Sequence, residues 1–177
     1  MKKEELMCGS SCVKYVLGKL GLSNVKIQNN MIWTAQLAIS LKQNGITDLN
    51  VYCFNSLLYD DFLLKKGEKF EGFKFLDDLI DMNISLMSKK LNMWELKKEI
   101  KNNAFIILCV ESKKFNKNKN MSGGHFIILN GKKDNKVKVI NPMKEKYEIK
   151  YLPKRFLINC CKRYGSWRIV IKGGKND

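Results

Sequence analysis

The sequence predicts an α+β fold in which N-terminal helices pack on a C-terminal antiparallel sheet. Hydrophobic residues recur at helical spacing through the first half, whereas in the second half they form strand-like runs separated by turn residues. Helices followed by strands, rather than alternating with them, are typical of the α+β class. With 177 residues, no internal repeat and no long linker, residues 1–177 are expected to form a single domain.

The first half predicts helices with a strand between them. Residues 10–20 form an apolar stripe at helical spacing that stops at Gly21, and residues 33–44 form a second that stops at Gly45. Residues 49–54 alternate as in a strand. Residues 56–82 are mixed and suggest a further helix through Phe73, Leu76, Leu79 and Ile80. Asn92 can cap a helix that runs from residue 94 to about 102.

The second half predicts mainly strands. Residues 104–111 form a buried strand, followed by a polar loop over residues 112–123. Residues 125–130 and 137–141 form a hairpin around a turn at residues 131–135. A strand over 147–152, a short helix over 153–164 and a last strand over 167–171 complete the prediction.

Composition narrows the class of protein. No apolar run approaches the roughly 20 residues that cross a bilayer, and acidic residues occupy the position of a secretory signal, so a cytoplasmic location is expected. The net charge of +16 has two interpretations: an ordinary lysine-rich, solvated surface, or a basic face for an anionic partner. Nucleic-acid binding is unsupported beyond this charge, because no binding motif accompanies the lysines.

Six cysteines are present, and their positions favour buried thiols over disulfides. They are Cys8, Cys12, Cys53, Cys109, Cys160 and Cys161, and most lie within apolar runs. With a single histidine and no paired Cys-x-x-Cys units, zinc is disfavoured, and no metal or cofactor is expected.

Cys8 is the candidate nucleophile. It lies at or next to the start of the first predicted helix, where unpaired backbone N–H groups and the helix dipole favour a thiolate. Cys12 lies one turn further along, on the apolar stripe, and is assigned to the core. Gly9 allows close approach of a substrate, and the Cys8 N–H is a candidate oxyanion donor.

His125, the only histidine, and Asn141 are the candidate base and its orienting group. Centring the turn near Lys133 places His125 opposite residues 141–142, so the two side chains are expected to be neighbours on adjacent strands. A lone histidine in an apolar strand is more often a hydrogen-bonded core residue. Gly123-Gly124 before it and Asn141-Pro142 opposite it favour the catalytic interpretation here.

The same residues carry a family resemblance. Cys8-Gly9-x-x-Cys12, Gly124-His125-Phe126 and Asn141-Pro142, which replaces the usual Asp-Pro, resemble the bacteriocin-leader (double-glycine) peptidases and their papain-like relatives. The guanylyl-cyclase-domain-containing family is a closer resemblance, carried by the order of Trp33-Thr34 with Leu37-Ala38, Gly124-His125-Phe126, Asn141-Pro142 and Tyr164-Gly165. The resemblance implies a papain-like fold, a Cys-His-Asn triad and cleavage or transfer at a peptide-like acyl group.

The chain departs from that pattern before the nucleophile. The peptidases usually carry a Gln about six residues ahead of the cysteine, as an oxyanion donor, and an Asp immediately ahead of it. Residues 2–7 contain neither. Losing such a donor costs about 3 kcal/mol of transition-state stabilisation in other enzymes. By residue type alone, Gln28 and Gln36 are candidate replacements.

Two functions from different classes remain open. The first is a papain-like thiol hydrolase or acyl-transferase that acts on a peptide or protein, including an acidic one or a precursor, through a thioester. The second is a weakened or inactive peptidase-fold binding module with a basic face for an anionic partner. A nucleotide cyclase is disfavoured, because no Gly-rich phosphate loop follows a strand.

Overall fold

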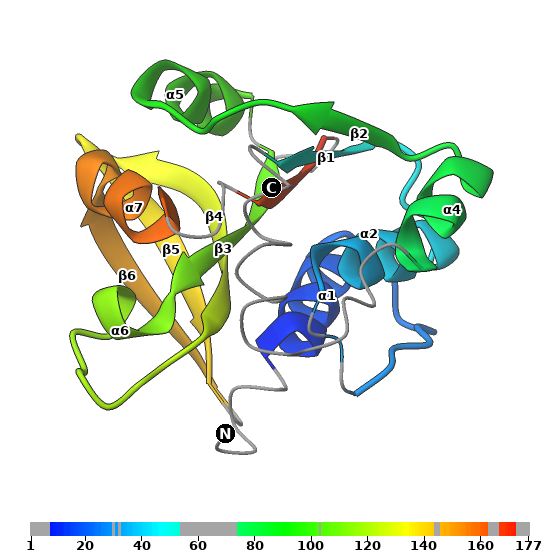
Figure 1. Ribbon diagram of the computed structural model, residues 1–177, viewed down its shortest axis with the longest axis horizontal. Coiled ribbons are helices and arrows are strands. Elements are labelled where there is room, and N and C mark those ends of the chain that lie inside the picture. The colour runs from blue at the N-terminus through cyan, green and yellow to red at the C-terminus, as the bar shows by residue number, and fades with distance from the viewer. Residues whose placement is uncertain are drawn as a thin grey trace.

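The computed structural model describes residues 8–29, 31, 33–53, 74–102, 104–143, 146–162 and 167–172. Over this part of the chain the fold is α+β, with six helices and a mixed sheet of seven strands (Figure 1). The predicted fold class is therefore confirmed at this level. The sequence features at Phe73 and at Tyr164-Gly165 lie outside the described residues.

The helices and strands follow one another in the order of their labels. The helices are α1 (Cys8–Lys19), α2 (Thr34–Gln43), α4 (Lys74–Asp81), α5 (Met93–Lys101), α6 (Ser112–Phe115) and α7 (Lys154–Cys161). The strands are β1 (Leu49–Cys53), β2 (Ser85–Ser88), β3 (Phe105–Glu111), β4 (Gly124–Lys133), β5 (Lys136–Pro142), β6 (Tyr147–Pro153) and β7 (Arg168–Ile171).

The sheet is mixed and includes strands from both halves of the chain, in contrast to the predicted C-terminal antiparallel sheet. The strand order is β2-β1-β7-β3-β4-β5-β6, so two strands of the first half extend the sheet on one side. β1 pairs in parallel with β2 and antiparallel with β7. β2 lies at the edge of the sheet and three of its four residues are exposed, so it has no apolar pattern from which to predict it.

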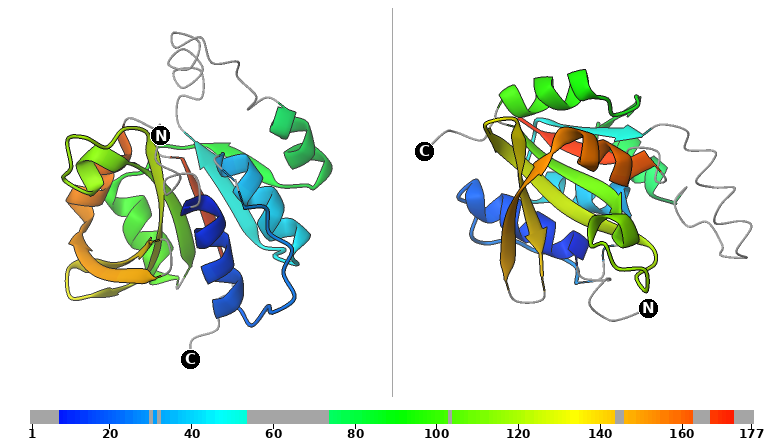
Figure 2. Two further views of the ribbon diagram at one scale, coloured as in Figure 1. Left: turned by 90° about the horizontal axis from the view of Figure 1, so that it is seen from below. Right: turned by 90° about the vertical axis from the view of Figure 1, so that its left-hand side faces the viewer.

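Helices cover both faces of the sheet, because neighbouring residues of a strand point to opposite sides. Ile107 of β3 and Ile128 of β4 pack with α1, α2 and α4 in one cluster of buried residues. Ile106 and Ile127 pack with α5, α6 and α7 in a second cluster. Figure 2 shows α1 and α2 on one side of the central strands and α6 and α7 on the other. The predicted packing of N-terminal helices on the sheet thus describes one face, and the helices of the second half cover the other.

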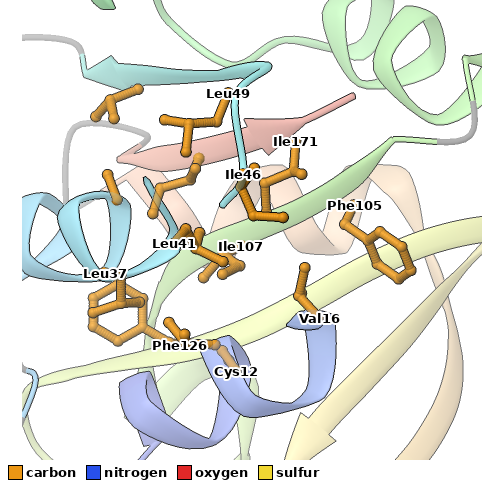
Figure 3. Close-up of a cluster of buried hydrophobic side chains, with 14 of the residues drawn as sticks. Cys12, Val16, Leu37, Leu41, Ile46, Leu49, Phe105, Ile107, Phe126 and Ile171 are labelled. Carbon is orange, nitrogen blue, oxygen red and sulfur yellow. The ribbon is translucent and has the colours of Figure 1, made fainter. Parts of the chain in front are cut away.

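The first cluster holds α1 against the sheet, and this contact positions the candidate site. Cys12 and Val16 of α1 are fully buried and lie near Phe126 and Ile107 of the central strands (Figure 3). Burying an aliphatic side chain of this size contributes about 1.5–3 kcal/mol. Because the stripe continues along α1, the helix is fixed in direction and its first turn meets the start of β4.

The polar loop predicted over residues 112–123 contains a short helix, α6, that the sequence pattern did not reveal. Its last residue, Phe115, is buried in the second cluster. A four-residue helix shows too little periodicity for a pattern-based prediction, and the surrounding lysines and asparagines conceal it. In the described part of the chain, no helix combines the length and the apolar character needed to cross a membrane.

Candidate active site

Cys8 is the first residue of α1, and its sulfur lies beside the backbone of β4. The Phe126 N–H donates a hydrogen bond to Cys8 Sγ over 3.5 Å. The first N–H groups of an α-helix have no partners within the helix, so the thiol lies where backbone dipoles favour negative charge. Cys8 is buried, with only 6% of its surface exposed.

Contacts on two sides fix the start of α1. Ser10 Oγ donates to the Gln28 carbonyl oxygen over 2.7 Å, which ties the first turn to the segment before α2. On the other side, the Tyr147 hydroxyl donates to the Ser11 carbonyl oxygen over 3.1 Å. The Tyr147 ring also meets Tyr15 edge-on, with ring centroids 4.7 Å apart. The turn that carries Cys8 is thus held between a loop and β6.

Gly9 is required because Met31 and Leu37 pack closely against the first turn of α1. A Cβ at Gly9 would lie directly against the Met31 carbonyl oxygen and 3.0 Å from Leu37 Cδ1. We expect Gly9→Ala to lower the free energy of unfolding by about 1–3 kcal/mol, because the backbone of Met31 must move. Urea unfolding followed by circular dichroism measures the change.

Gly18→Ala in the same helix is the matched control for Gly9→Ala. A Cβ at Gly18 meets no atom within 4 Å, and alanine is the better helix former, so a gain of about 0.5–1 kcal/mol is expected. Equal effects of the two substitutions would contradict the packing argument for Gly9.

His125 and Asn141 are joined by a short hydrogen bond. The His125 Nε2–H donates to Asn141 Oδ1 over 2.7 Å, and both residues are buried, at 8% and 1% exposed. The second ring nitrogen, Nδ1, is the one nearer the histidine backbone. Cys8 Sγ is hydrogen-bonded to that same stretch of backbone, at Phe126. The structure therefore joins His125 to Asn141 directly and places the Cys8 sulfur beside the backbone of the residue that follows His125.

The strand register that brings His125 and Asn141 together differs from the predicted one. The turn is the two-residue Asp134-Asn135, flanked by the pair Lys133 and Lys136, and the register shifts between Leu129 and Lys132. Beyond that shift Ile128 pairs with Ile140. Asn141 is thus a diagonal rather than a direct neighbour of His125. Both residues occupy the same face, so the side chains still meet.

The environment of the imidazole favours its neutral form. The Phe115 ring packs beside it, with centroids 5.9 Å apart and planes inclined by 35°. Burial lowers the pKa of His125 from the usual 6.5, and the bond to Asn141 opposes this only in part. A neutral ring at neutral pH is the form that can accept a proton from a thiol.

This pKa shift predicts how stability depends on pH. Below 6.5 the unfolded chain binds a proton at His125 more readily than the folded chain does. The free energy of unfolding should therefore fall by up to about 1 kcal/mol as pH drops from about 7.5 to about 5.5. Urea unfolding of the wild type and of His125→Gln at both pH values isolates this contribution. NMR titration of the only imidazole should give a pKa below 6.5; a value above it would contradict the prediction.

Three further thiols of the described residues lie in the two clusters of buried side chains. Cys12, Cys109 and Cys160 are reduced and buried. Burial, followed by the neighbouring Cys8 and Cys109, raises the pKa of Cys12 well above its usual value. Burial likewise raises the pKa of Cys160 to about 11. A thiol with a raised pKa forms little thiolate near neutral pH, which supports the assignment of Cys12 to the core.

The two candidate glutamines have different surroundings. Gln36 Oε1 accepts the Trp33 N–H over 3.1 Å, so this side chain is part of the start of α2. The Gln28 side chain is exposed. Its backbone carbonyl accepts the hydrogen bond from Ser10 in the first turn of α1. The backbone of Gln28 is therefore bound to the turn that carries Cys8. Residues 1–7, which lack the usual Gln, lie outside the described residues.

Sequence reasoning missed three residues that contact the histidine–asparagine pair. Phe115 packs on the His125 ring. Glu148 accepts a hydrogen bond from Asn141 Nδ2 over 3.2 Å, and Met143 Sδ lies 3.6 Å from the same nitrogen. Glu148 pairs directly with Asn141 across the hairpin of β5 and β6. Since residues 147–152 were predicted as a strand, the register of that hairpin was the signal that could have revealed it. Within the described residues, no group of three or more His, Cys, Asp or Glu side chains is arranged to hold a metal ion.

Comparison with known proteins identifies no family for this chain. The sequence matches no protein-family model and has no significant match to a curated protein.

Proposed function

We propose that the protein is a papain-like thiol hydrolase or acyl-transferase that acts on a peptide or protein. Cys8 is the nucleophile, His125 the general base and acid, and Asn141 the group that orients the imidazole. The observation that carries the proposal is the pair of contacts that meet at the start of β4. Asn141 holds Nε2 of the ring, and the next backbone N–H along the strand holds the Cys8 sulfur.

The proposed reaction uses each of these groups in turn. His125 Nδ1 accepts the thiol proton, and the Cys8 sulfur attacks the substrate carbonyl carbon. The C–N bond breaks, the imidazolium gives its proton to the departing amine, and a thioester remains on Cys8. Water or a second amine then attacks the thioester and releases the sulfur. Asn141 keeps the ring in one orientation through both halves of the reaction.

In the proposed reaction, hydrogen-bond donors must stabilise the oxyanion that forms on the substrate carbonyl oxygen. The backbone N–H groups of the first turn of α1 are suited to this, because helix geometry leaves them without acceptors within the helix. Gln28 and Gln36 are candidates for the side-chain donor by residue type alone, because the contact of Gln28 with Ser10 engages its backbone carbonyl and not its side chain. A cytoplasmic location and an acidic or precursor peptide substrate, suggested by the net charge of +16, belong to the same proposal.

Alkylation with iodoacetamide near neutral pH tests the proposal. Tryptic mapping by mass spectrometry measures the labelling rate of all six cysteines in one sample. We expect labelling concentrated on Cys8, although it is only 6% exposed, because a polarised thiol reacts faster than the core thiols. Cys160, with a pKa raised to about 11, is an internal reference for the folded state.

The binding module is the second candidate, and one observation favours it. The low exposure of Cys8, combined with the absence of Gln from residues 2–7, describes a site in which catalysis has been weakened. This candidate predicts slow, uniform labelling of the six cysteines in the same experiment. It also predicts that binding of an anionic partner survives Cys8→Ser and weakens with added salt.

A further inference from the structure

Glu148 forms the outer end of a chain of side chains that begins at the imidazole. It lies on β6 opposite Asn141, and its Oε2 accepts the Asn141 Nδ2–H over 3.2 Å. The same oxygen pairs with Lys150 Nζ at 2.8 Å. Hydrogen bonds from Lys150 and Asn141 lower the pKa of the Glu148 carboxyl, so this group is ionised at neutral pH.

An ionised carboxylate can only accept hydrogen bonds, whereas an amide side chain can face a neighbour with either end. With Glu148 on one side, Asn141 must present its NH₂ group outward and its Oδ1 toward His125. A second acceptor supports the same orientation of the amide. Met143 Sδ lies 3.6 Å from Asn141 Nδ2, and a thioether sulfur is also a hydrogen-bond acceptor. The amide therefore has a single favourable orientation.

This orientation decides which ring nitrogen of His125 carries the proton. Facing Oδ1 at 2.7 Å, Nε2 must donate, so the proton of the neutral ring lies on Nε2 and the lone pair on Nδ1. A reversed amide would place Nδ2 against Nε2 and favour the opposite tautomer. Nδ1 would then be protonated and unable to accept the thiol proton.

We propose that Glu148 is a positioning residue: by fixing the amide of Asn141, it selects the His125 tautomer that carries its proton on Nε2 and leaves Nδ1 as the basic nitrogen. The inference rests on the proposed function for its catalytic meaning. The selection of the tautomer rests only on the contacts among the three side chains. Lys150 neutralises the carboxylate but does not touch the amide, so its contribution to the tautomer is secondary.

The chain is well suited to a direct test, because it contains one histidine and its ring nitrogens can be observed without assignment ambiguity. Long-range ¹H–¹⁵N correlation spectra at about pH 7.5 distinguish a protonated from an unprotonated ring nitrogen. The wild type should show the Nε2–H form. Glu148→Gln keeps the shape but offers both a donor and an acceptor, so a substantial Nδ1–H population should appear.

The same variant should alkylate Cys8 roughly three- to tenfold more slowly with iodoacetamide. Lys150→Gln is the matched control, because it removes the ion pair and leaves the carboxylate; its tautomer and labelling rate should stay within about twofold of the wild type. Glu148 is exposed, and backbone amide spectra of each variant report whether the fold is intact.

The two readouts separate the failure of this inference from failure of the proposed function. An unchanged tautomer and an unchanged labelling rate in Glu148→Gln overturn the role of Glu148, whatever the reactivity of Cys8. A changed tautomer in a protein whose Cys8 shows no preferential labelling confirms the selection by Glu148 and overturns the thiol chemistry. An Nδ1–H tautomer in the wild type overturns both.

Discussion

His125→Ala should slow the alkylation of Cys8 by iodoacetamide roughly 100-fold near neutral pH, the lower end of the range for loss of a general base. The reaction requires the thiolate, and in the proposed site the imidazole takes the proton from the thiol. Without the ring, formation of the thiolate depends on the backbone dipoles of α1 alone. The second-order rate at Cys8, measured by mass spectrometry of quenched samples, gives the effect directly.

Two comparisons make the His125→Ala result specific. Asn141→Ala retains the imidazole but frees its orientation, so a smaller loss of about tenfold is expected. Labelling of Cys160 should be the same in all three proteins, because this thiol lies on α7 and is fully buried in the second cluster. A His125→Ala protein that labels Cys8 as fast as the wild type would refute the role of the base. A parallel rise at Cys160 would indicate unfolding instead.

The elements around the nucleophile could be predicted because each carries a strong local pattern. The apolar stripe that includes Cys12 and Val16 predicts α1, and the structure starts this helix at Cys8 rather than two residues later. The run of buried residues in β3 is equally informative, since all seven are buried. In both cases the pattern and the packing agree, so propensity and burial predict the same element.

The relation of His125 to Asn141 was predicted for a partly incorrect reason. The assumed hairpin had a wider turn, whereas the chain reverses at Asp134-Asn135, with Asp134 at φ 53°, and then shifts register before Ile128. The shift keeps His125 and Asn141 on one face of the sheet. Such a local irregularity depends on how β4 twists against its neighbours, and no short-range sequence pattern encodes it.

Contacts between distant segments were beyond prediction for a different reason. The pairing of β7 with both β1 and β3, and the ion pair between Glu99 and Arg168, join residues far apart in the sequence. A single arginine in a short apolar strand gives no sign of its partner. Only the folded arrangement shows that this charge is fully buried, and its energetic importance follows from that burial.

Glu99→Ala should lower the free energy of unfolding by about 3–5 kcal/mol. Arg168 has no exposed surface, and its Nε and Nη2 donate to Glu99 Oε1 over 3.2 and 3.1 Å. Its Nη1 donates to the Lys89 carbonyl oxygen, and its guanidinium lies 4.2 Å from the centre of the Tyr52 ring. Removing the carboxylate leaves a buried guanidinium without its counter-charge. Urea unfolding of the variant and the wild type measures the loss.

The loss of stability in Glu99→Ala should come from burying the Arg168 charge without the Glu99 carboxylate. It should not come from a large net stabilisation by the ion pair itself. Burial raises the pKa of Glu99 and outweighs the opposing effect of Arg168, which shows how strongly this environment disfavours charge. The double variant Glu99→Leu/Arg168→Met, which replaces both charges with apolar side chains, should therefore recover most of the stability lost in Glu99→Ala.

Asp48→Ala is the control for an exposed ion pair. The pair between Asp48 and Lys172 spans 3.5 Å, and the two side chains are 59% and 53% exposed. A loss below about 1 kcal/mol is expected there. If Glu99→Ala were as mild as Asp48→Ala, water or another acceptor would have to reach Arg168, and the central strands would be less tightly closed around it than the structure shows.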